Sequence, residues 1–294
     1  MPELPEVETV RRGLAPYVEG ARIEAVTLNR KDLRFPFPKG LVKVLTGETI
    51  ESIGRRAKYL LFRLSNGKTL LSHLGMTGTY RFEAFTFKEP SRYHEPRPEE
   101  KHDHLVLDLS HPERGKLRLI YNDARRFGFV DLFENEKESP YLAGLGPEPL
   151  SKDFSAEEMA ARFKAKKAPV KTALLDQRVV AGLGNIYVSE ALHRAHIRPD
   201  VEARTLVLKS GAASKRLDDL AAGVRTVLIE AVEAGGSTLR DFRAADGGPG
   251  YFQHRFAVYD REGQPCPTPL CAGTIRRIVQ SGRSTFYCPV CQRK

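Results

Sequence analysis

The stretch CPTPLCAGTIRRIVQSGRSTFYCPVC, residues 266–291, decides the fold of the C-terminal end of the chain. It contains all four cysteines of the sequence, Cys266, Cys271, Cys288 and Cys291. They form two close pairs with four and two intervening residues, and sixteen residues separate the pairs. Thiolates at this spacing suit a tetrahedral structural Zn²⁺ site on a β-hairpin, which in isolated fingers is worth on the order of 10–16 kcal/mol. Four reduced cysteines scattered in a small core are the less favoured alternative, because the spacing is paired.

The same tail is basic. Between Gly263 and Lys294 there is no Asp or Glu, yet five residues are Lys or Arg. The whole chain has 294 residues with 47 Lys+Arg against 37 Asp+Glu, a net charge of +10. This excess favours a polyanionic partner, although net charge also accompanies plain solubility. The composition, 41% hydrophobic and 29% charged, is globular and excludes general disorder.

No targeting or membrane segment is predicted. No stretch approaches the roughly 18–20 apolar residues of a membrane span, and the N-terminus lacks the basic-then-apolar layout of a signal peptide. We therefore expect a cytoplasmic protein.

The N-terminal part predicts one helix followed by strands. Pro5 suits the first helical turn, the acids Glu6 and Glu8 favour its positive end, Arg11 and Arg12 favour its negative end, and Gly13 is expected to close it. One face of this helix is apolar. Six β-type runs follow: Arg22–Leu28, Tyr59–Leu64, Lys68–Leu74, His104–Leu109, Lys116–Tyr121 and Phe127–Phe133. Short runs joined by turn residues predict an antiparallel β-sandwich, with an exposed excursion at Phe85–Lys101.

Downstream, the pattern changes. Residues 135–150 are rich in Gly and Pro and predict a linker, and a helical region follows. The longest apolar stripe runs from Leu217 to Ala231 and ends at Gly235 and Gly236. We predict an α+β chain with an N-terminal β-sandwich domain at 1–134, a linker at 135–150, a helical domain at 151–250 and a zinc-finger module at 251–294.

The N-terminus offers a nucleophile. If Met1 is removed, Pro2 carries a free secondary amine, whose reference pKa near 8 makes it a better neutral nucleophile at pH 7 than lysine. Such an amine condenses with an aldehyde-level carbon, and Glu3 and Glu6 stand close as acid or base. The alternative is a proline-capped helix start, which local sequence alone favours.

Three other motifs admit two interpretations each. The basic run at 55–59 is a solvated edge, or Lys58 faces a phosphate. Met76 and Phe127 finish a core, or they are wedges for a nucleic-acid stack. Gly182-Leu183-Gly184-Asn185 is a tight turn, or it presents helix amides to phosphate.

Taken together, the segments resemble the bacterial formamidopyrimidine-DNA glycosylase family. The matching pieces run in the family's order over nearly the whole chain: PELPEVETVRRGL at 2–14, RRAKYLL at 55–61, HLGMTG at 73–78, KHDH at 101–104, RRFG at 125–128, LGPEPL at 145–150, GLGNIYVSEAL at 182–192, DGGPGYF at 246–252 and GRSTFYC at 282–288. The ordered set is specific, whereas any single piece is not.

This resemblance implies a β-sandwich, a helix-two-turn-helix domain and a zinc finger, with double-stranded DNA in a cleft and one structural Zn²⁺. It implies a monomeric base excision repair enzyme, associated with the nucleoid through DNA. The enzyme would excise oxidised purines, chiefly 8-oxoguanine and formamidopyrimidines, from a flipped-out nucleotide, and would cleave the abasic site by β,δ-elimination.

The resemblance also implies roles for single residues. Pro2 would be the nucleophile and Glu3 the acid, with Glu6 in support and Lys58 on phosphate. Met76, Arg125 and Phe127 would fill the vacated stack. The further DNA-binding residues would be His73, Lys171, Asn185, Arg283 and, in a glycine-rich loop at 244–251 that closes over the purine, Tyr251.

The sequence departs from the family pattern at the first zinc pair, where the family usually has two intervening residues and this chain has four. The excursion at 85–101 is also longer than expected. Two other hypotheses stay open: an endonuclease VIII-like enzyme for oxidised pyrimidines, disfavoured by the PELPE start and the RRF wedge, and a non-catalytic zinc protein that binds DNA.

Overall fold

The computed structural model describes residues 2–84, 100–237 and 250–294. The chain divides into two compact units, Met1–Ala143 with Gly235–Gly250, and Gly144–Ala234 with Tyr251–Lys294. Most of the predicted excursion at 85–101 and of the glycine-rich loop at 244–251 lies outside the described residues. Among the residues that are described, no helix has both the length and the apolar character needed to cross a membrane.

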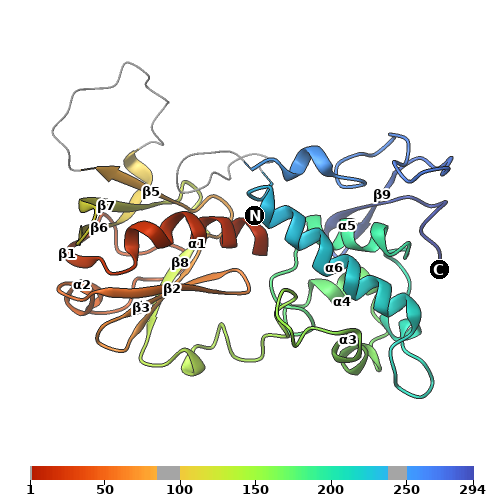
Figure 1. Ribbon diagram of the computed structural model, residues 1–294, viewed down its shortest axis with the longest axis horizontal. Helices are drawn as coiled ribbons and strands as arrows, with labels where there is room; N and C mark the ends of the chain where they lie inside the picture. The colour runs from red at the N-terminus through yellow and green to blue at the C-terminus, as the bar shows by residue number, and fades with distance from the viewer. Residues whose placement is uncertain (1, 85–99, 238–249) are drawn as a thin grey trace. The chain divides into compact units, whose positions relative to one another are not determined.

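The first unit contains the predicted β-sandwich, so this prediction is confirmed. Two four-stranded antiparallel sheets have the strand orders β1-β6-β7-β5 and β2-β3-β4-β8. The first sheet consists of β1 (Arg22–Leu28), β6 (Asp103–His111), β7 (Gly115–Asn122) and β5 (Thr79–Ala84). The second consists of β2 (Ile50–Arg56), β3 (Tyr59–Leu64), β4 (Thr69–His73) and β8 (Phe129–Phe133). Apolar side chains from both sheets and from α1 (Leu4–Val18) form one core, and Figure 1 shows α1 running alongside the strands.

Two strands were not predicted from the sequence. β2 has only two fully buried side chains, and β5 reads Thr-Tyr-Arg-Phe-Glu-Ala, so neither has a clear apolar signal. Backbone pairing with neighbouring strands stabilises both, because β2 pairs with β3 and β5 pairs with β7 along their lengths. The prediction for the last run was two residues too long, since β8 begins at Phe129.

The predicted end of α1 was wrong. The helix passes through Gly13 and ends at Val18, with Pro16 inside it. Leu14 and Val18 are both fully buried, and burying two aliphatic side chains outweighs the roughly 1 kcal/mol that an interior glycine costs. The arginines expected at its negative end therefore lie mid-helix.

Those arginines form an ion-pair network with Glu8. Arg11 Nη2 lies 2.8 Å from Glu8 Oε1, and Arg12 Nε lies 2.9 Å from the same oxygen. From β2, Arg55 Nε donates to Glu8 Oε2 at 3.1 Å. These hydrogen bonds and charges overcome burial and hold the pKa of Glu8 below its usual value.

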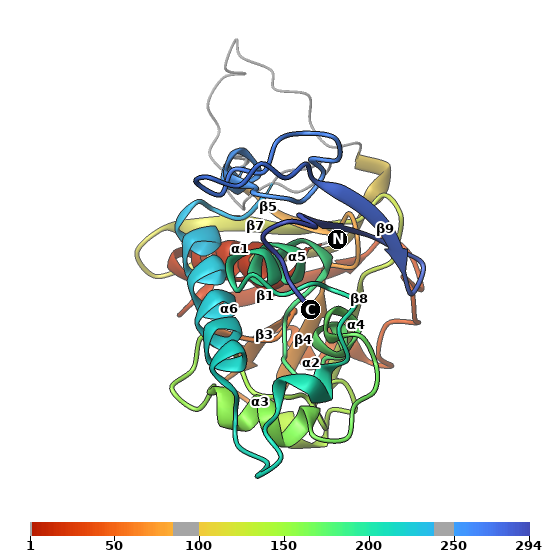
Figure 2. The same cartoon turned by 90° about the vertical axis from the view of Figure 1, so that its right-hand side faces the viewer.

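The second unit is helical and ends in a β-hairpin. Its helices are α3 (Ala156–Phe163), α4 (Val170–Leu175), α5 (Asn185–Arg194) and α6 (Lys215–Glu233), and its hairpin strands are β9 (Arg276–Gln280) and β10 (Arg283–Tyr287). The predicted stripe of α6 is confirmed, with every stripe residue buried, and Gly235 follows its end at a φ of +74°. α5 and α6 pack side by side (Figure 2). Within the described residues of both units, the short helices are α2 (Leu41–Leu45) in the first unit and 3-10 turns at Glu100–His102 and Glu136–Glu138 in the first unit and at Ala203–Leu206 and Phe252–Arg255 in the second.

Glu190 on α5 holds the segment that leads into the cysteine module. Its carboxylate accepts backbone hydrogen bonds from Ala257 at 2.8 Å, Val258 at 3.0 Å and Tyr259 at 2.8 Å. The side chain is fully buried, so no water replaces it as an acceptor. Burial nevertheless raises the pKa of Glu190, and the three amides oppose that shift.

Replacing Glu190 by Ala is expected to destabilise the protein by about 3–5 kcal/mol, because three buried amides lose their acceptor. Glu190→Gln keeps one acceptor oxygen and should cost less. Urea unfolding followed by circular dichroism measures both. Glu158→Ala, which removes an exposed ion pair with Arg162 on α3, is the control and should cost under about 0.5 kcal/mol.

Candidate functional site

The start of α1 buries two carboxylates next to Pro2. Glu3 is 3% exposed and Glu6 is 2% exposed, and Pro2 is buried beside them. The Glu3 amide donates to Glu6 Oε2 at 2.9 Å, and the Glu3 side chain accepts from the Glu6 amide. This reciprocal capping box fixes the direction in which the chain enters the helix.

A distant segment shares the Glu6 carboxylate. Glu6 Oε1 accepts hydrogen bonds from the amide of Ser237 at 2.8 Å and from its hydroxyl at 3.0 Å. A Cβ on Gly236, whose φ is +79°, would lie 3.0 Å from the same oxygen, so the backbone approaches closely here. Sequence reasoning missed Ser237, because the two preceding glycines were explained by the end of a helix.

Lys58 lies on the tight turn between β2 and β3. The side chain is 8% exposed and Arg55 is similarly covered, so the solvated-edge interpretation of this basic run was wrong. Ala57, just before Lys58, has a φ of 51°, and its carbonyl accepts from Arg55 Nη1 at 2.9 Å. The turn is thus fixed by its own basic neighbour, Arg55.

Two loops of the sandwich are joined through Asp123. Its Oδ1 accepts from the Thr77 hydroxyl at 2.5 Å, and its Oδ2 accepts from the Gly128 amide at 2.8 Å. Thr77 in turn accepts from the amide of Arg125 at 3.1 Å. This fully buried aspartate therefore connects the loop of Met76 to the loop of Arg125 and Phe127.

Glycines bring the same two loops into backbone contact. Gly75 has a φ of +64°, and a Cβ there would lie 2.2 Å from the Gly128 nitrogen. A Cβ on Gly128 would lie 1.9 Å from the Tyr121 hydroxyl oxygen. Only glycine is compatible with either position, so these residues set the spacing between the loops.

The side chains at the loop tips differ in exposure. Phe127 is 44% exposed, so the interpretation that it finishes a core was wrong, and the Arg125 guanidinium lies 4.8 Å from its ring centroid. Met76 is partly buried. The structure thus brings together the three residues predicted as wedges, and their role stays a prediction.

His73, at the end of β4, is a neutral acceptor. Its Nδ1 accepts from the amide of Gly75 at 3.0 Å. The pKa of His73 is lowered to about 4, first by burial and then by the charges of Lys58 and Arg34. The ring is therefore unprotonated at neutral pH and supports the Gly75 turn.

In the second unit, Lys171 and Asn185 converge on the hairpin. Lys171 is fully buried, and its Nζ donates to the Ser284 carbonyl at 3.0 Å and to Thr285 Oγ1 at 2.5 Å. Asn185 Nδ2 donates to the same carbonyl at 2.9 Å, and its Oδ1 is buried without a partner among the described residues. Both predicted phosphate contacts thus hold β10 in this structure.

Arg283 and Tyr251 are exposed. Tyr251 is 61% exposed, and its amide donates to the Ala234 carbonyl at 3.0 Å. Arg283 begins β10 at the hairpin tip, beside a cavity of about 420 Å³. The polar residues lining this cavity are Lys166, Thr172, Asp176, Arg178, Ser281 and Arg283.

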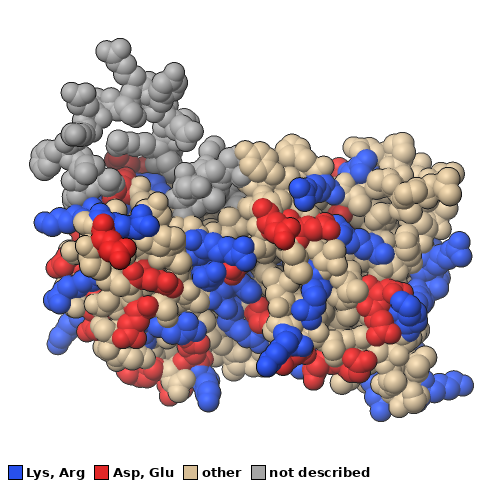
Figure 3. All heavy atoms as spheres, in the orientation of Figure 1, with Lys and Arg blue, Asp and Glu red and all other residues tan. Residues whose placement is uncertain are grey.

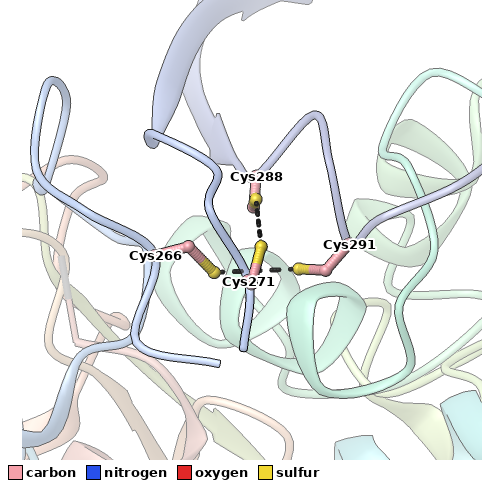
Figure 4. A group of neighbouring side chains, drawn as sticks. All are labelled: Cys266, Cys271, Cys288 and Cys291. Atoms are coloured by element: carbon pink, nitrogen blue, oxygen red, sulfur yellow. Dashed lines mark hydrogen bonds between the residues drawn. The ribbon is translucent and has the colours of Figure 1, made fainter. Parts of the chain in front are cut away.

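The four cysteines meet as predicted. Their sulfur atoms lie within 4.8 Å of one another, with 3.7 Å between Cys266 and Cys291 and 3.6 Å between Cys271 and Cys288 (Figure 4). Four sulfurs at about 2.3 Å from a tetrahedral Zn²⁺ lie about 3.8 Å apart, so the geometry fits this ion. The longer first knuckle does not prevent the cluster from forming.

Comparison with known families covers almost the whole chain. Residues 1–130 match the formamidopyrimidine-DNA glycosylase N-terminal domain, residues 145–243 match the H2TH domain of the same enzymes, and residues 263–293 match the zinc finger found in FPG and IleRS. The chain belongs to the formamidopyrimidine-DNA glycosylase family. The last domain and the cysteine cluster together assign one structural zinc ion as its cofactor.

Relatives and solved structures of the family agree. Formamidopyrimidine-DNA glycosylases of Allorhizobium ampelinum and Agrobacterium fabrum are 55% and 54% identical, each over 100% of both chains. A crystal structure of Lactococcus lactis Fpg with DNA containing an abasic site superposes with a TM-score of 0.82, at 35% identity over 99% of this chain and 100% of the other. A complex of that protein with DNA containing N7-benzyl-Fapy-dG gives 0.83, at 36% identity over 100% of both chains.

Charge is mixed on the face drawn in Figure 3, where acidic side chains lie among basic ones. Some of the charges in the described residues are paired, as in the bonds of Arg118 to Asp108 at 2.7 Å and of Arg194 to Glu230 at 2.5 Å. The net charge of +10 therefore does not translate into one uniform basic surface on this face of the glycosylase.

Gly75→Ala is expected to destabilise the protein by about 3–4 kcal/mol, because it adds backbone strain at positive φ and overlaps the facing loop. Gly67→Ala is the matched control. Gly67 has a φ of +80°, but a Cβ added there would meet no atom within 4 Å, so this variant carries only the strain of about 1–2 kcal/mol. Chemical denaturation measures both, and equal losses would show that the loops are not in steric contact.

The lowered pKa of His73 predicts loss of stability in acid. The unfolded chain takes up a proton near pH 6.5 and the folded chain only near pH 4. This contribution is therefore fully present above about pH 6.5 and is lost as the pH falls to 4, by on the order of 2–3 kcal/mol. His73→Asn keeps an acceptor but does not titrate, so its unfolding free energy should fall less over this range than that of the wild type.

Proposed function

We propose that this chain is a bifunctional DNA glycosylase that excises oxidised purines and cleaves the resulting abasic site. The observation that carries the proposal is the buried start of α1, where Pro2 directly precedes a carboxylate pair that is fixed by the capping box. Chain termini are ordinarily frayed, so tying one down this firmly favours a chemical role. The proposal includes removal of Met1, which lies outside the described residues.

The excision step uses the Pro2 amine as nucleophile. Its nitrogen attacks C1′ of the damaged nucleotide, the bond from C1′ to the base breaks, and the base leaves with a proton. Glu3 donates a proton to the ring oxygen O4′ as the sugar opens, which leaves an iminium between C1′ and Pro2. Glu6, with both of its oxygens engaged, positions Glu3 and the helix start.

Strand cleavage follows from the same iminium, which acidifies the protons on C2′. Loss of one C2′ proton expels the 3′ phosphate from C3′. The iminium is then conjugated with the new C2′=C3′ bond, so loss of the C4′ proton expels the 5′ phosphate from C5′. Hydrolysis of the iminium then releases the sugar fragment and restores the amine. The product is a one-nucleoside gap, and no step consumes an oxidant or reductant.

Contacts to DNA are assigned to residues of both units. The exposed Phe127, with Arg125 and Met76, would fill the stack after the damaged base is flipped out, as reaction at C1′ requires. Lys58 and Arg283 would contact phosphates. The structures of Lactococcus lactis Fpg bound to abasic-site and Fapy-dG DNA support this partner, and DNA binding would place the protein at the nucleoid.

The helical residues receive narrower assignments. Asn185 has one buried oxygen without a partner among the described residues and one amide nitrogen on β10, so it would place the hairpin for phosphate contact. Lys171 would act in the same way, through its bonds to β10. Tyr251, exposed after the glycine-rich segment, would meet the DNA directly.

Reductive trapping tests the mechanism. Borohydride reduces the iminium to a stable amine, so the processed protein should form a covalent complex with duplex DNA that contains 8-oxoguanine. Pro2→Gly with Glu3→Gln should abolish trapping, and Glu3→Gln alone should lower the excision rate by about 10²–10⁴-fold. Mass spectrometry of the N-terminus confirms that Met1 is absent.

Two comparisons distinguish the remaining hypotheses. A protein with an additional residue before Pro2 has an amide in place of the amine, and trapping by that form would exclude the N-terminal mechanism. Faster trapping on thymine-glycol DNA than on 8-oxoguanine DNA would favour an endonuclease VIII-like enzyme. Binding of DNA without trapping by processed protein would leave a zinc protein that binds DNA but does not cleave it.

A further inference from the structure

Two side chains outside the cysteine set lie against its sulfur atoms. Nε2 of His193, on α5, lies 3.5 Å from Cys266 Sγ and 3.2 Å from Thr268 Oγ1. The Thr268 oxygen is in turn 3.4 Å from Cys266 Sγ and 3.7 Å from Cys291 Sγ. The imidazole therefore contacts Cys266, and the hydroxyl contacts both Cys266 and Cys291.

The chemistry of a four-thiolate site calls for such donors. Each cysteine gives up its proton to bind the metal, so its sulfur becomes an acceptor only. Zn²⁺ with four thiolates has a net charge of 2 − 4 = −2, and burying a charge is costly unless hydrogen-bond donors face it. Cys266 and Cys288 are the most buried of the set, at 8% and 0% exposure.

The distances define a short relay. In the tautomer that carries its proton on Nε2, His193 offers one N–H, either to Cys266 Sγ or to Thr268 Oγ1, and Thr268 offers one hydroxyl proton. Because the imidazole N–H can only donate, the hydroxyl proton of Thr268 is left for sulfur in both arrangements. His193 is 6% exposed, so water has little access to the ring.

The unusual length of the first knuckle is what supplies Thr268. Four residues separate Cys266 from Cys271, and Thr268 stands between Pro267 and Pro269, whose rings restrict the backbone. The knuckle closes with a bond from the Cys271 amide to the Thr268 carbonyl at 3.1 Å. A knuckle with two intervening residues has less room for a side chain that turns back on the metal site.

We propose that His193 and Thr268 form an outer hydrogen-bond shell of the zinc site that retains the metal, with His193 connecting a ligand sulfur to α5. The zinc ligands are the four cysteines, and both new residues are positioning residues. The proposal is independent of the glycosylase chemistry, because it concerns only how tightly zinc is held.

Zinc release from the full-length, zinc-loaded protein tests the relay. A chromogenic chelator, 4-(2-pyridylazo)resorcinol, in fixed excess reports the rate. Thr268→Val removes the hydroxyl at nearly constant shape and should release zinc about 10-fold faster, in the range known for lost outer-shell partners. Thr268→Ser should behave as wild type, because the hydroxyl is kept. His193→Phe should also accelerate release, and His193→Gln should restore part of the loss.

Thr205→Val is the control. It removes a hydroxyl of the same unit whose hydrogen bond goes to the Glu202 carbonyl, at 2.7 Å, and not to a sulfur atom. Its release rate should equal that of the wild type. In the double variant of Thr268→Val and His193→Phe, the fold-increase in the zinc release rate should be smaller than the product of the two single fold-increases, because both changes break one relay.

A spectroscopic readout separates the relay from a general loosening of the fold. In the Co²⁺-loaded protein, loss of a hydrogen bond to sulfur should shift the thiolate-to-metal charge-transfer bands in Thr268→Val and not in Thr205→Val. Unchanged release rates in both Thr268→Val and His193→Phe would overturn the proposal. So would equal acceleration by Thr268→Ser and Thr268→Val.

Discussion

The carboxylate of Glu6 is the interaction on which the N-terminal architecture depends. Its two oxygens receive the amide of Glu3 and both donors of Ser237, so it fixes a helix start and a segment 231 residues away in sequence. Hydrogen bonds to an ionised acceptor are worth about 1.5–3 kcal/mol each, more than the ordering of a terminal residue costs. A terminus that would otherwise fray is thereby given one conformation, which is the first requirement for an amine that has to meet a carbon at a set angle.

The fold could be predicted well wherever the apolar pattern was local. The apolar run in β3, the stripe of α6 and the paired cysteines each carry their own signal, and the structure confirms them. β2 and β5 carry no such signal, because only some of their side chains enter the core and backbone pairing with β3 and β7 completes them. The end of α1 was missed for a related reason: a glycine marks a local preference, and tertiary burial of Leu14 and Val18 overrides it.

The site shows the same division. Pro2 and Glu3 could be named from the sequence, but the choice between a nucleophile and a helix cap could not be made locally. For Glu3 a capping role and a chemical role are compatible, since the capping box fixes the position from which its side chain would act. Ser237 and Asp123 were missed as partners because their contacts span large sequence separations or depend on a close approach of glycines. Buried Lys171 could not be foreseen either, since a lysine in sequence suggests an exposed charge.

The contacts of helix α5 limit how the C-terminal module can be transferred to another protein. Within ten residues it holds the Ser284 carbonyl through Asn185, three successive amides through Glu190, and the sulfur of Cys266 through His193. The finger is therefore only partly self-contained: zinc closes its knuckles, but the helix serves as the surface against which the hairpin and its leading segment are aligned. The module therefore depends on α5 for its alignment. Grafting residues 263–293 onto another protein would move the metal site and leave behind the template that aims its arginines.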